Sequence, residues 1–352
     1  MLITIIAFLA VLVVLVLAHE CGHFFTARAT GVRIEEFGIG FPPRLFSIKR
    51  GETRYSINIL PLGGFVKMAG EEDPNVPGSL AGKSAGVRVL VLASGAIMNA
   101  LLPIILLSAA FMIPHSVASG QVVVEEVAAG SPAAQAGIKA GDTVLMIDGN
   151  QVHNIGDLQR NIQLKLGQQV DIFVEHSDLT RETVQVMPRW RPAEGEGATG
   201  IVVGLANATT VRQSYPFWKA VPMGVNECVE TYILFKNAII SMLIGTSPAV
   251  VAGPVGIAQI TGEAARAGLS YLLEFAAFFS INLAVINIFP LPALDGGRIA
   301  FVLLEWVRRG KRVSPRIEGI VHTIGFFALL AVMAAVTFHD IIRIISGGSV
   351  IP

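Results

Sequence analysis

Charged residues are scarce in this sequence. Asp, Glu, Lys and Arg make up 15% of its 352 residues, whereas hydrophobic residues make up 53%. A soluble domain carries about 25% charged residues, so this chain lacks the charge that a soluble protein of its size needs on its surface. Basic and acidic residues number 26 each, and without a net positive field nucleic acid is not an expected partner. The only cysteines are Cys21 and Cys228, which excludes a disulfide framework.

Residues 2–18, 89–113, 275–294 and 319–338 contain no Asp, Glu, Lys or Arg. Each approaches the ~20 apolar residues that a helix needs to cross a bilayer. The sequence therefore predicts a polytopic α-helical membrane protein with about four transmembrane helices and the lipid bilayer as a partner. The first segment is expected to be a span and not a cleaved signal peptide, because no basic segment precedes it and no small-residue cleavage site follows.

A fifth apolar stretch, residues 220–245, is interrupted by Glu227, Glu230 and Lys236. A further span is one interpretation, but the pattern favours an amphipathic helix at the membrane surface, anchored by the aromatic residues just before it. We therefore interpret residues 191–250 as a linker followed by this helix.

The distribution of Lys and Arg predicts the orientation in the membrane. Nine basic residues lie in residues 28–88, after the first span, and six lie in residues 298–316, after the third. Both segments should face the cytoplasm under the positive-inside rule. Residues 115–216 contain seven basic and eleven acidic residues and are expected outside. Two membrane halves, residues 1–114 and 251–352, thus enclose an external domain.

The external domain begins with residues 115–190, which contain short β-type runs. Val- and Ile-rich runs occur at 122–124, 143–147 and 170–174, and Ser-Pro-Ala-Ala at 131–134 suits one turn of helix. The pattern Ser-Pro-Ala…Ala-Gly-Ile…Gly-Asp…Ile-Asp-Gly resembles a bacterial PDZ domain. This resemblance implies an inserted α+β domain with a groove that takes a peptide by strand addition at a sheet edge. A bulky spacer without a ligand is the alternative.

The first hydrophobic segment ends in His19-Glu20-Cys21-Gly22-His23, the pattern His-Glu-x-x-His. Histidines four residues apart lie on one face of a helix, so both imidazoles can reach one Zn²⁺. Glu20 lies about 100° further round the helix, where it can take a proton from an attacking water without being a ligand. The alternative is a pair of histidines bonded to neighbours, but ionisable groups in a span are costly and usually functional.

A catalytic zinc site needs a third protein ligand, and Asp295 is the candidate. It follows twenty uncharged residues and stands in the segment Asn-Ile-Phe-Pro-Leu-Pro-Ala-Leu-Asp-Gly-Gly. Pro290 and Pro292 interrupt helical hydrogen bonds, and irregular backbone at membrane depth is tolerated where it is buried in protein or lines a cavity. We expect a broken helix that brings the Asp295 carboxylate to the histidines. Helix capping and pairing with Arg298 are the alternatives.

These two motifs, in this order and membrane context, resemble those of the site-2 protease family of intramembrane zinc metalloproteases. The chain is most similar to the bacterial regulator-of-sigma-E protease (RseP) branch, with one PDZ domain where enteric members have two. The resemblance implies one zinc ion per chain, held by His19, His23 and Asp295, with Glu20 as the general base. It also matches Asn287 to a family asparagine near the active site, whose amide is a donor for the substrate backbone or the developing oxyanion. An interhelical hydrogen bond is the alternative role.

Substrate binding requires that a helix be unwound, because its amides are otherwise bonded internally. In the family, the segment corresponding to residues 36–70 is a membrane re-entrant β-loop. An unpaired strand edge there is expected to pair with the unwound substrate, and an ordinary cytoplasmic hairpin is the alternative. Asn99 is expected to contact either the substrate helix or a neighbouring helix. The candidate edge residues are Tyr55, Ile57, Ile59, Gly63 and Gly64.

Together these features predict a zinc metalloendopeptidase that cuts within or near the transmembrane segments of single-span membrane proteins. The branch implies substrates such as anti-sigma-factor-like proteins already trimmed by another protease, and remnant signal peptides. The site is expected near the cytoplasmic side of a bacterial inner membrane, with the PDZ domain outside, where it gates or selects substrates. A metal transporter and a non-catalytic scaffold are competing hypotheses. The sequence lacks the inverted repeat expected of the first, and it retains Glu20 and Asp295, whose loss would favour the second.

Overall fold

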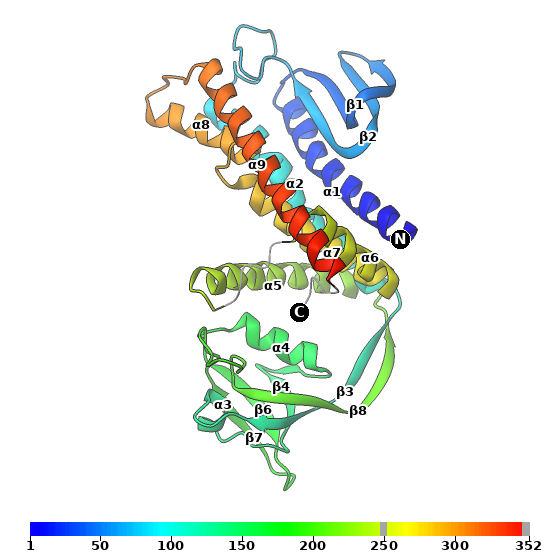
Figure 1. The fold of residues 1–352 in the computed structure, drawn as a ribbon, viewed down its shortest axis with the longest axis vertical. Coiled ribbons are helices and arrows are strands. Elements are labelled where there is room, and N and C mark those ends of the chain that lie inside the picture. The colour runs from blue at the N-terminus through cyan, green and yellow to red at the C-terminus, as the bar shows by residue number, and fades with distance from the viewer. Residues whose placement is uncertain (247–251, 347–352) are drawn as a thin grey trace. The chain divides into compact units, whose positions relative to one another are not determined.

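The computed structural model describes residues 1–246 and 252–346. The chain divides into two compact units, of which the second begins at Phe111 and the first joins Met1–Ala110 to the C-terminal part. The predicted boundary between residues 250 and 251 lies outside the described residues. Figure 1 shows the elements of each unit along the chain.

Long apolar helices dominate the first unit. They are α1 (Leu2–Ala29), α2 (Ala85–Met112), α6 (Pro254–Ala267), α7 (Leu269–Ile288), α8 (Asp295–Val307) and α9 (Pro315–Ile345). Within residues 1–246 and 252–346, α1, α2, α7 and α9 are the helices long and apolar enough to cross a membrane. These four helices coincide with the four spans that the sequence predicts.

Two shorter helices of this unit, α6 and α8, were not predicted. α6 packs against α1, α7 and α9, and α8 begins directly after the turn that ends α7. α6 has 14 residues and α8 has 13, and both carry charged residues, so neither is long and apolar enough to mark a span. Their helical state is decided by the packing of their apolar faces on the neighbouring helices.

A β-hairpin follows α1 directly, formed by β1 (Ile34–Arg50) and β2 (Thr53–Met68). Its pairing is more complex than that of a simple hairpin. Phe37 of β1 lies opposite both Tyr55 and Val66 of β2. The long β1 strand therefore contacts two separate parts of β2.

This pairing excludes a free strand edge at residues 54–57, which include the predicted edge residues Tyr55 and Ile57. Ile57 lies opposite both Ile39 and Phe46, so this part of β2 is already paired on both sides. A strand with neighbours on both sides has no free backbone groups to offer a substrate. By contrast, the ladder of Gly64–Met68 is formed with residues 34–39 alone.

The base of the hairpin shares one apolar core with α1, α2 and α8. Phe24 of α1 lies edge-on to Phe37, with ring centroids 5.3 Å apart. Val91 of α2 and Ile299 of α8 are buried in the same cluster. This core fixes the end of α1 relative to the hairpin and α8.

The second unit contains one sheet, short helices and the long helix α5. Its elements are β3 (His115–Val127), α3 (Pro132–Gln135), β4 (Thr143–Ile147), β5 (Asn150–Gln151), α4 (Ile155–Leu164), β6 (Val170–Glu175), β7 (Arg181–Val186), β8 (Ile201–Gln213) and α5 (Phe217–Leu243). The strand order is β7-β6-β4-β3-β8, with β5 paired to β4. Figure 1 shows β3 and β8 as one long antiparallel ribbon. The strands predicted at 122–124, 143–147 and 170–174 are confirmed, as is the short helix after Ser131.

The sheet continues beyond residue 190, where the sequence predicted the domain to end and a linker to begin. β8 pairs with β3 from His115↔Gln213 to Val127↔Ile201, so residues 201–213 belong to the domain. The prediction missed β8 because its partner lies about 80 residues earlier in the chain, and local pattern carries no signal of such long-range pairing.

Polar residues of α5 contact α4. In a helix that lies on the membrane surface, such residues would be expected to face solvent. Arg160 of α4 pairs with Glu227 and with Glu230, at 2.5 and 2.8 Å. Asn237 is buried and donates to the backbone carbonyl of Gln163 at 2.7 Å. Two of the charges that interrupt this apolar stretch, Glu227 and Glu230, therefore attach α5 to the sheet domain.

Candidate active site

Two elements of the first unit bring three ligand-type side chains together. His19 and His23 come from α1, and Asp295 is the first residue of α8. The Nε2 atoms of the two histidines lie 3.0 and 3.1 Å from Oδ2 of Asp295 and 3.2 Å from each other. Among residues 1–246 and 252–346, this is the only group of three or more such side chains close enough to share a metal ion.

The spacing of these donor atoms fits a tetrahedral zinc ion. With Zn–N distances of about 2.0–2.1 Å, tetrahedral ligand atoms lie about 3.3 Å apart, close to the observed 3.0–3.2 Å. Two imidazole nitrogens and one carboxylate oxygen are also a donor set that zinc accepts. Three protein ligands leave one position open, as catalysis requires.

A backbone hydrogen bond orients His23. Its Nδ1 lies 2.8 Å from the carbonyl oxygen of Val91 in α2, and a carbonyl can only accept. Nδ1 therefore carries the proton and Nε2 has the lone pair that a metal needs. The Nδ1 atom of His19 is buried without a partner among the described residues, so α2 orients only one of the two rings in this way.

Two glycines allow α1 and α2 to cross at the histidine pair. A Cβ atom on Gly22 would overlap the backbone carbonyl of Ser94, and one on Gly95 would overlap the rings of His19 and His23. The histidine rings therefore lie directly on the backbone of α2. Close helix approach of this kind requires small residues at the crossing.

Glu20 faces the β-hairpin. The Cβ position of Gly64 is 3.1 Å from the Cγ atom of Glu20, and the backbone of Val66 also lies near the Glu20 carboxylate. The same carboxylate interacts electrostatically with His19, His23 and Asp295. It therefore lies between the three ligand-type residues and the Gly64–Met68 part of β2, outside the ligand set.

A turn between α7 and α8 delivers Asp295, and α9 supports that turn. The backbone N–H of Ala293 donates to Nδ1 of His322 at 2.9 Å, and Ala293 has a left-handed φ of 73°. The His322 ring also packs against Phe301 of α8, with centroids 5.6 Å apart. Sequence analysis missed His322, because its only signal is a lone histidine in an apolar segment.

Ion pairs hold α8 in place around this turn. Arg298 pairs with Glu71 at 2.6 Å and not with Asp295, which contradicts the alternative that Asp295 is its partner. Glu305 is bound by Arg88 of α2 and by Arg312, at 2.5 and 3.2 Å. Burial disfavours the charged form of Glu305, but these two arginines outweigh it and hold the pKa of Glu305 below its usual value.

The two predicted asparagines differ in accessibility. Asn287, near the end of α7, is half-buried, and its side chain has no hydrogen bond to any residue that the structure describes. The side chain of Asn99 is 1% exposed and lies between helices, with Ser280 donating to its backbone carbonyl at 2.8 Å. Of the two roles expected for Asn99, this burial favours contact with a neighbouring helix over direct contact with a substrate helix.

The predicted substrate-edge residues separate into two groups. Tyr55 packs with Phe24 in the core near the end of α1, and Ile57 and Ile59 are exposed on the hairpin. Gly64 is beside Glu20, and its neighbour Gly63 contacts the ring of Phe41. Of the five, only the glycine pair therefore belongs to the part of β2 that adjoins the candidate site.

Comparison with known proteins gives a family match over most of the chain. Residues 7–332 match Peptidase family M50. A Clostridium perfringens protein with the provisional name of a zinc metalloprotease is 39% identical over 337 residues, covering 93% of this chain and 95% of the relative. A similarly named protein of Nostoc sp. is 35% identical over 339 residues, covering 91% of each chain. The zinc metalloprotease RasP of Geobacillus kaustophilus is 30% identical over 423 aligned positions, covering 96% of this chain and 97% of the relative.

Proposed function

Since this chain belongs to peptidase family M50 and is a multi-pass membrane zinc metalloprotease, we propose that it hydrolyses peptide bonds within or near the transmembrane segments of single-span membrane proteins. The observation that carries the proposal is the convergence of His19, His23 and Asp295, whose ligand atoms lie within 4.8 Å of one another. Two of these residues lie in a span-length helix, so the chemistry takes place at a membrane.

In this proposal, His19, His23 and Asp295 hold one zinc ion, which when bound polarises the scissile carbonyl and acidifies water. Glu20 takes the proton of the attacking water and returns it to the leaving amine. The free amide of Asn287 donates to the oxyanion that develops on the scissile carbonyl. Gly64 and Val66 of β2 lie beside the Glu20 side chain and so place it next to the site.

We further infer that the substrate pairs with Gly64–Met68 of β2, and not with residues 54–57. The one-sided pairing of this segment and its contact with Glu20 support this choice. An extended substrate segment added here satisfies its backbone groups once its helix is unwound. Gly64 has no side chain to keep that segment away from Glu20.

The second unit is proposed to be an extracytoplasmic PDZ domain that gates or selects substrates. Its sheet with short helices supports this, and β8 lies at the end of the strand order with α4 nearby. Peptide addition at β8 would then follow the PDZ mode. On this proposal the protein belongs to the regulator-of-sigma-E protease branch in a bacterial inner membrane. It would cut pre-trimmed anti-sigma-factor-like proteins and remnant signal peptides near the cytoplasmic side.

The catalytic proposal is tested by cleavage of a model single-span substrate in liposomes, with zinc counted in each variant. Glu20→Gln should keep zinc and lose cleavage by at least ~10²-fold, because a general base contributes about 10²–10⁴-fold. Asp295→Asn should lose both zinc and activity. Glu194→Gln, an acid-to-amide change at an exposed position of the second unit, is the control. Wild-type activity in Glu20→Gln would show that Glu20 is not the base.

The gating proposal needs a different comparison, with one substrate made in two forms. One form carries a folded external domain and the other a short external tail. Wild type should cleave the short form at least tenfold faster. Equal cleavage of both forms would contradict gating and leave the metal site unaffected.

A further inference from the structure

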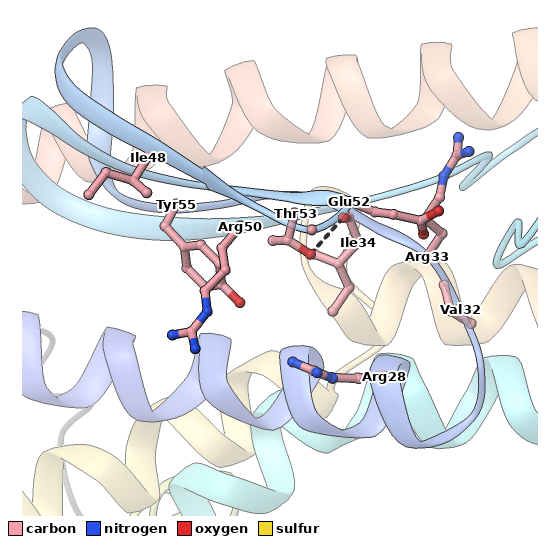
Figure 2. Close-up of a pocket in the computed structure, with 10 residues that line it drawn as sticks. Arg28, Val32, Arg33, Ile34, Ile48, Arg50, Glu52, Thr53 and Tyr55 are labelled. Carbon is pink, nitrogen blue, oxygen red and sulfur yellow. Dashed lines mark hydrogen bonds between the residues drawn. The ribbon is translucent and has the colours of Figure 1, made fainter.

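A cavity of about 900 Å³ lies between the end of α1 and the turn of the β1–β2 hairpin. Arg28, in the last turn of α1, lines one side, and Arg50, at the end of β1, lines the other. Figure 2 shows both guanidinium groups in the space between the helix and the hairpin. The catalytic proposal uses neither residue.

The cavity has an excess of positive charge. It is lined by three arginines, Arg28, Arg33 and Arg50, and one acid, Glu52, which gives 3 − 1 = +2. Arg33 lies 3.7 Å from Glu35. Within the described parts of the chain, no carboxylate lies within 4.0 Å of Arg28 or Arg50. Two guanidinium groups that line one cavity and have no acidic partners are suited to bind a phosphate.

The surroundings of the cavity are those of a membrane interface. Arg28 lies in the last turn of a span-length helix whose residues 2–18 are uncharged. On the hairpin, Ile48 lines the cavity and is 55% exposed, and nearby Leu45 and Phe46 are also exposed. Exposed apolar side chains beside basic residues are typical of segments that lie at the headgroup level of a bilayer.

We propose that this cavity binds the headgroup of an anionic glycerophospholipid. Its phosphodiester lies between Arg28 and Arg50, and its acyl chains lie along the exposed apolar side chains of the hairpin. The lipid thus joins the end of α1 to the same hairpin that carries Gly64 beside Glu20. This inference depends on the membrane location of the chain and not on the catalytic proposal.

The test uses the zinc-loaded full chain in detergent micelles and native mass spectrometry. Phosphatidylglycerol and phosphatidylcholine with identical acyl chains are titrated separately. Wild type should retain phosphatidylglycerol at lower concentration than phosphatidylcholine. In Arg28→Gln/Arg50→Gln the affinity for phosphatidylglycerol should fall about 25-fold, because each basic residue near an anionic lipid contributes about fivefold.

A matched control separates a defined site from general charge attraction. Lys49→Gln/Arg54→Gln also removes two positive charges, both from the hairpin, but these side chains line a different cavity. This variant should keep the preference for phosphatidylglycerol, as should Arg28→Lys/Arg50→Lys. Unchanged zinc content in each variant shows that the active site still folds.

Three outcomes would overturn the inference. In the first, wild type retains both lipids equally. In the second, the control variant loses as much affinity for phosphatidylglycerol as Arg28→Gln/Arg50→Gln. In the third, 10 mM inorganic phosphate displaces phosphatidylglycerol completely, which would identify a site for free phosphate and not for a lipid.

Discussion

At the scale of single residues, a glycine of α2 decides whether the two histidines of α1 can meet a metal. The rings of His19 and His23 occupy the space that a side chain on Gly95 would fill. The histidines supply the ligand chemistry, but the missing side chain supplies the room for it. Gly95 has no catalytic chemistry of its own, and only the packing of α2 on α1 reveals its part in the site.

The first prediction follows from this contact. Gly95→Ala should lower zinc affinity at least tenfold, because the added methyl group must displace a ligand ring. Gly86→Ala, in the first turn of the same helix with no atom within 4 Å of its Cβ position, should leave zinc binding unchanged. Zinc titration of both purified variants checks this, and normal affinity in Gly95→Ala would contradict the crossing geometry.

At the scale of elements, the turn between α7 and α8 depends on α9. His322 accepts the Ala293 N–H, and a Cβ atom on Gly325 would overlap Pro292. Helix α9 therefore packs on the turn that ends at Asp295. A span that contributes no ligand still determines where the third ligand lies.

The second prediction concerns this support. His322→Ala should weaken zinc binding about 10–100-fold, the usual cost of losing a residue that orients a metal ligand. His322→Gln, whose side-chain oxygen can still accept the Ala293 N–H, should recover part of the affinity. His339→Ala, at an exposed position of the same helix, is the control. Equal affinity in all three would show that α9 does not position Asp295.

The third prediction concerns the ion pair between α2 and α8. Removing the carboxylate in Glu305→Gln should destabilise the first unit by about 2 kcal/mol, because hydrogen bonds to charged groups contribute about 1.5–3 kcal/mol. The folded state lowers the pKa of Glu305. The ionised Glu305 carboxylate therefore stabilises the fold above its unfolded pKa of about 4.3, and this contribution is lost as pH falls through the folded pKa. Unfolding temperatures measured from pH 7 to pH 3 should therefore differ between wild type and variant at neutral pH and become equal at low pH. A constant difference would exclude this origin.

At the scale of the whole molecule, the two units have separate cores. The sheet unit has its own cluster, including Val122, Ile147 and Ile172, and the membrane unit has the cluster around Phe24 and Val91. A change confined to the sheet unit should therefore leave zinc binding unaffected. This separation makes it possible to test each unit within the intact chain.

The fourth prediction uses this separation. Hydrogen bonds to Asp142 and Glu182 raise the pKa of His176, with Nδ1 2.9 Å from Asp142 and Nε2 2.9 Å from Glu182. The contribution of protonated His176 to the stability of the sheet unit is complete below its unfolded pKa of about 6.5. It is lost as pH rises through the raised folded pKa. Hydrogen exchange of β6 and β7 should therefore quicken above pH 6.5, after correction for intrinsic rates, in wild type but not in His176→Gln. Zinc content should be equal in the two, and identical pH profiles would exclude this role.

The sequence by itself determined the four spans, the His-Glu-x-x-His helix, the broken segment before Asp295 and the first strands of the sheet unit. These features depend on local hydrophobicity, periodicity and turn chemistry, which neighbouring residues fix. For the same reason, the ligand-type residues could be named before any packing was known.

Only the tertiary structure decided which surfaces those elements present to one another. It paired residues 54–57 on both sides and placed Gly64 beside Glu20, it added β8 to the sheet, and it put His322 behind the turn at Ala293. Each of these contacts joins residues far apart in the chain. Their free energy comes from packing and long-range pairing, to which local sequence preference contributes little.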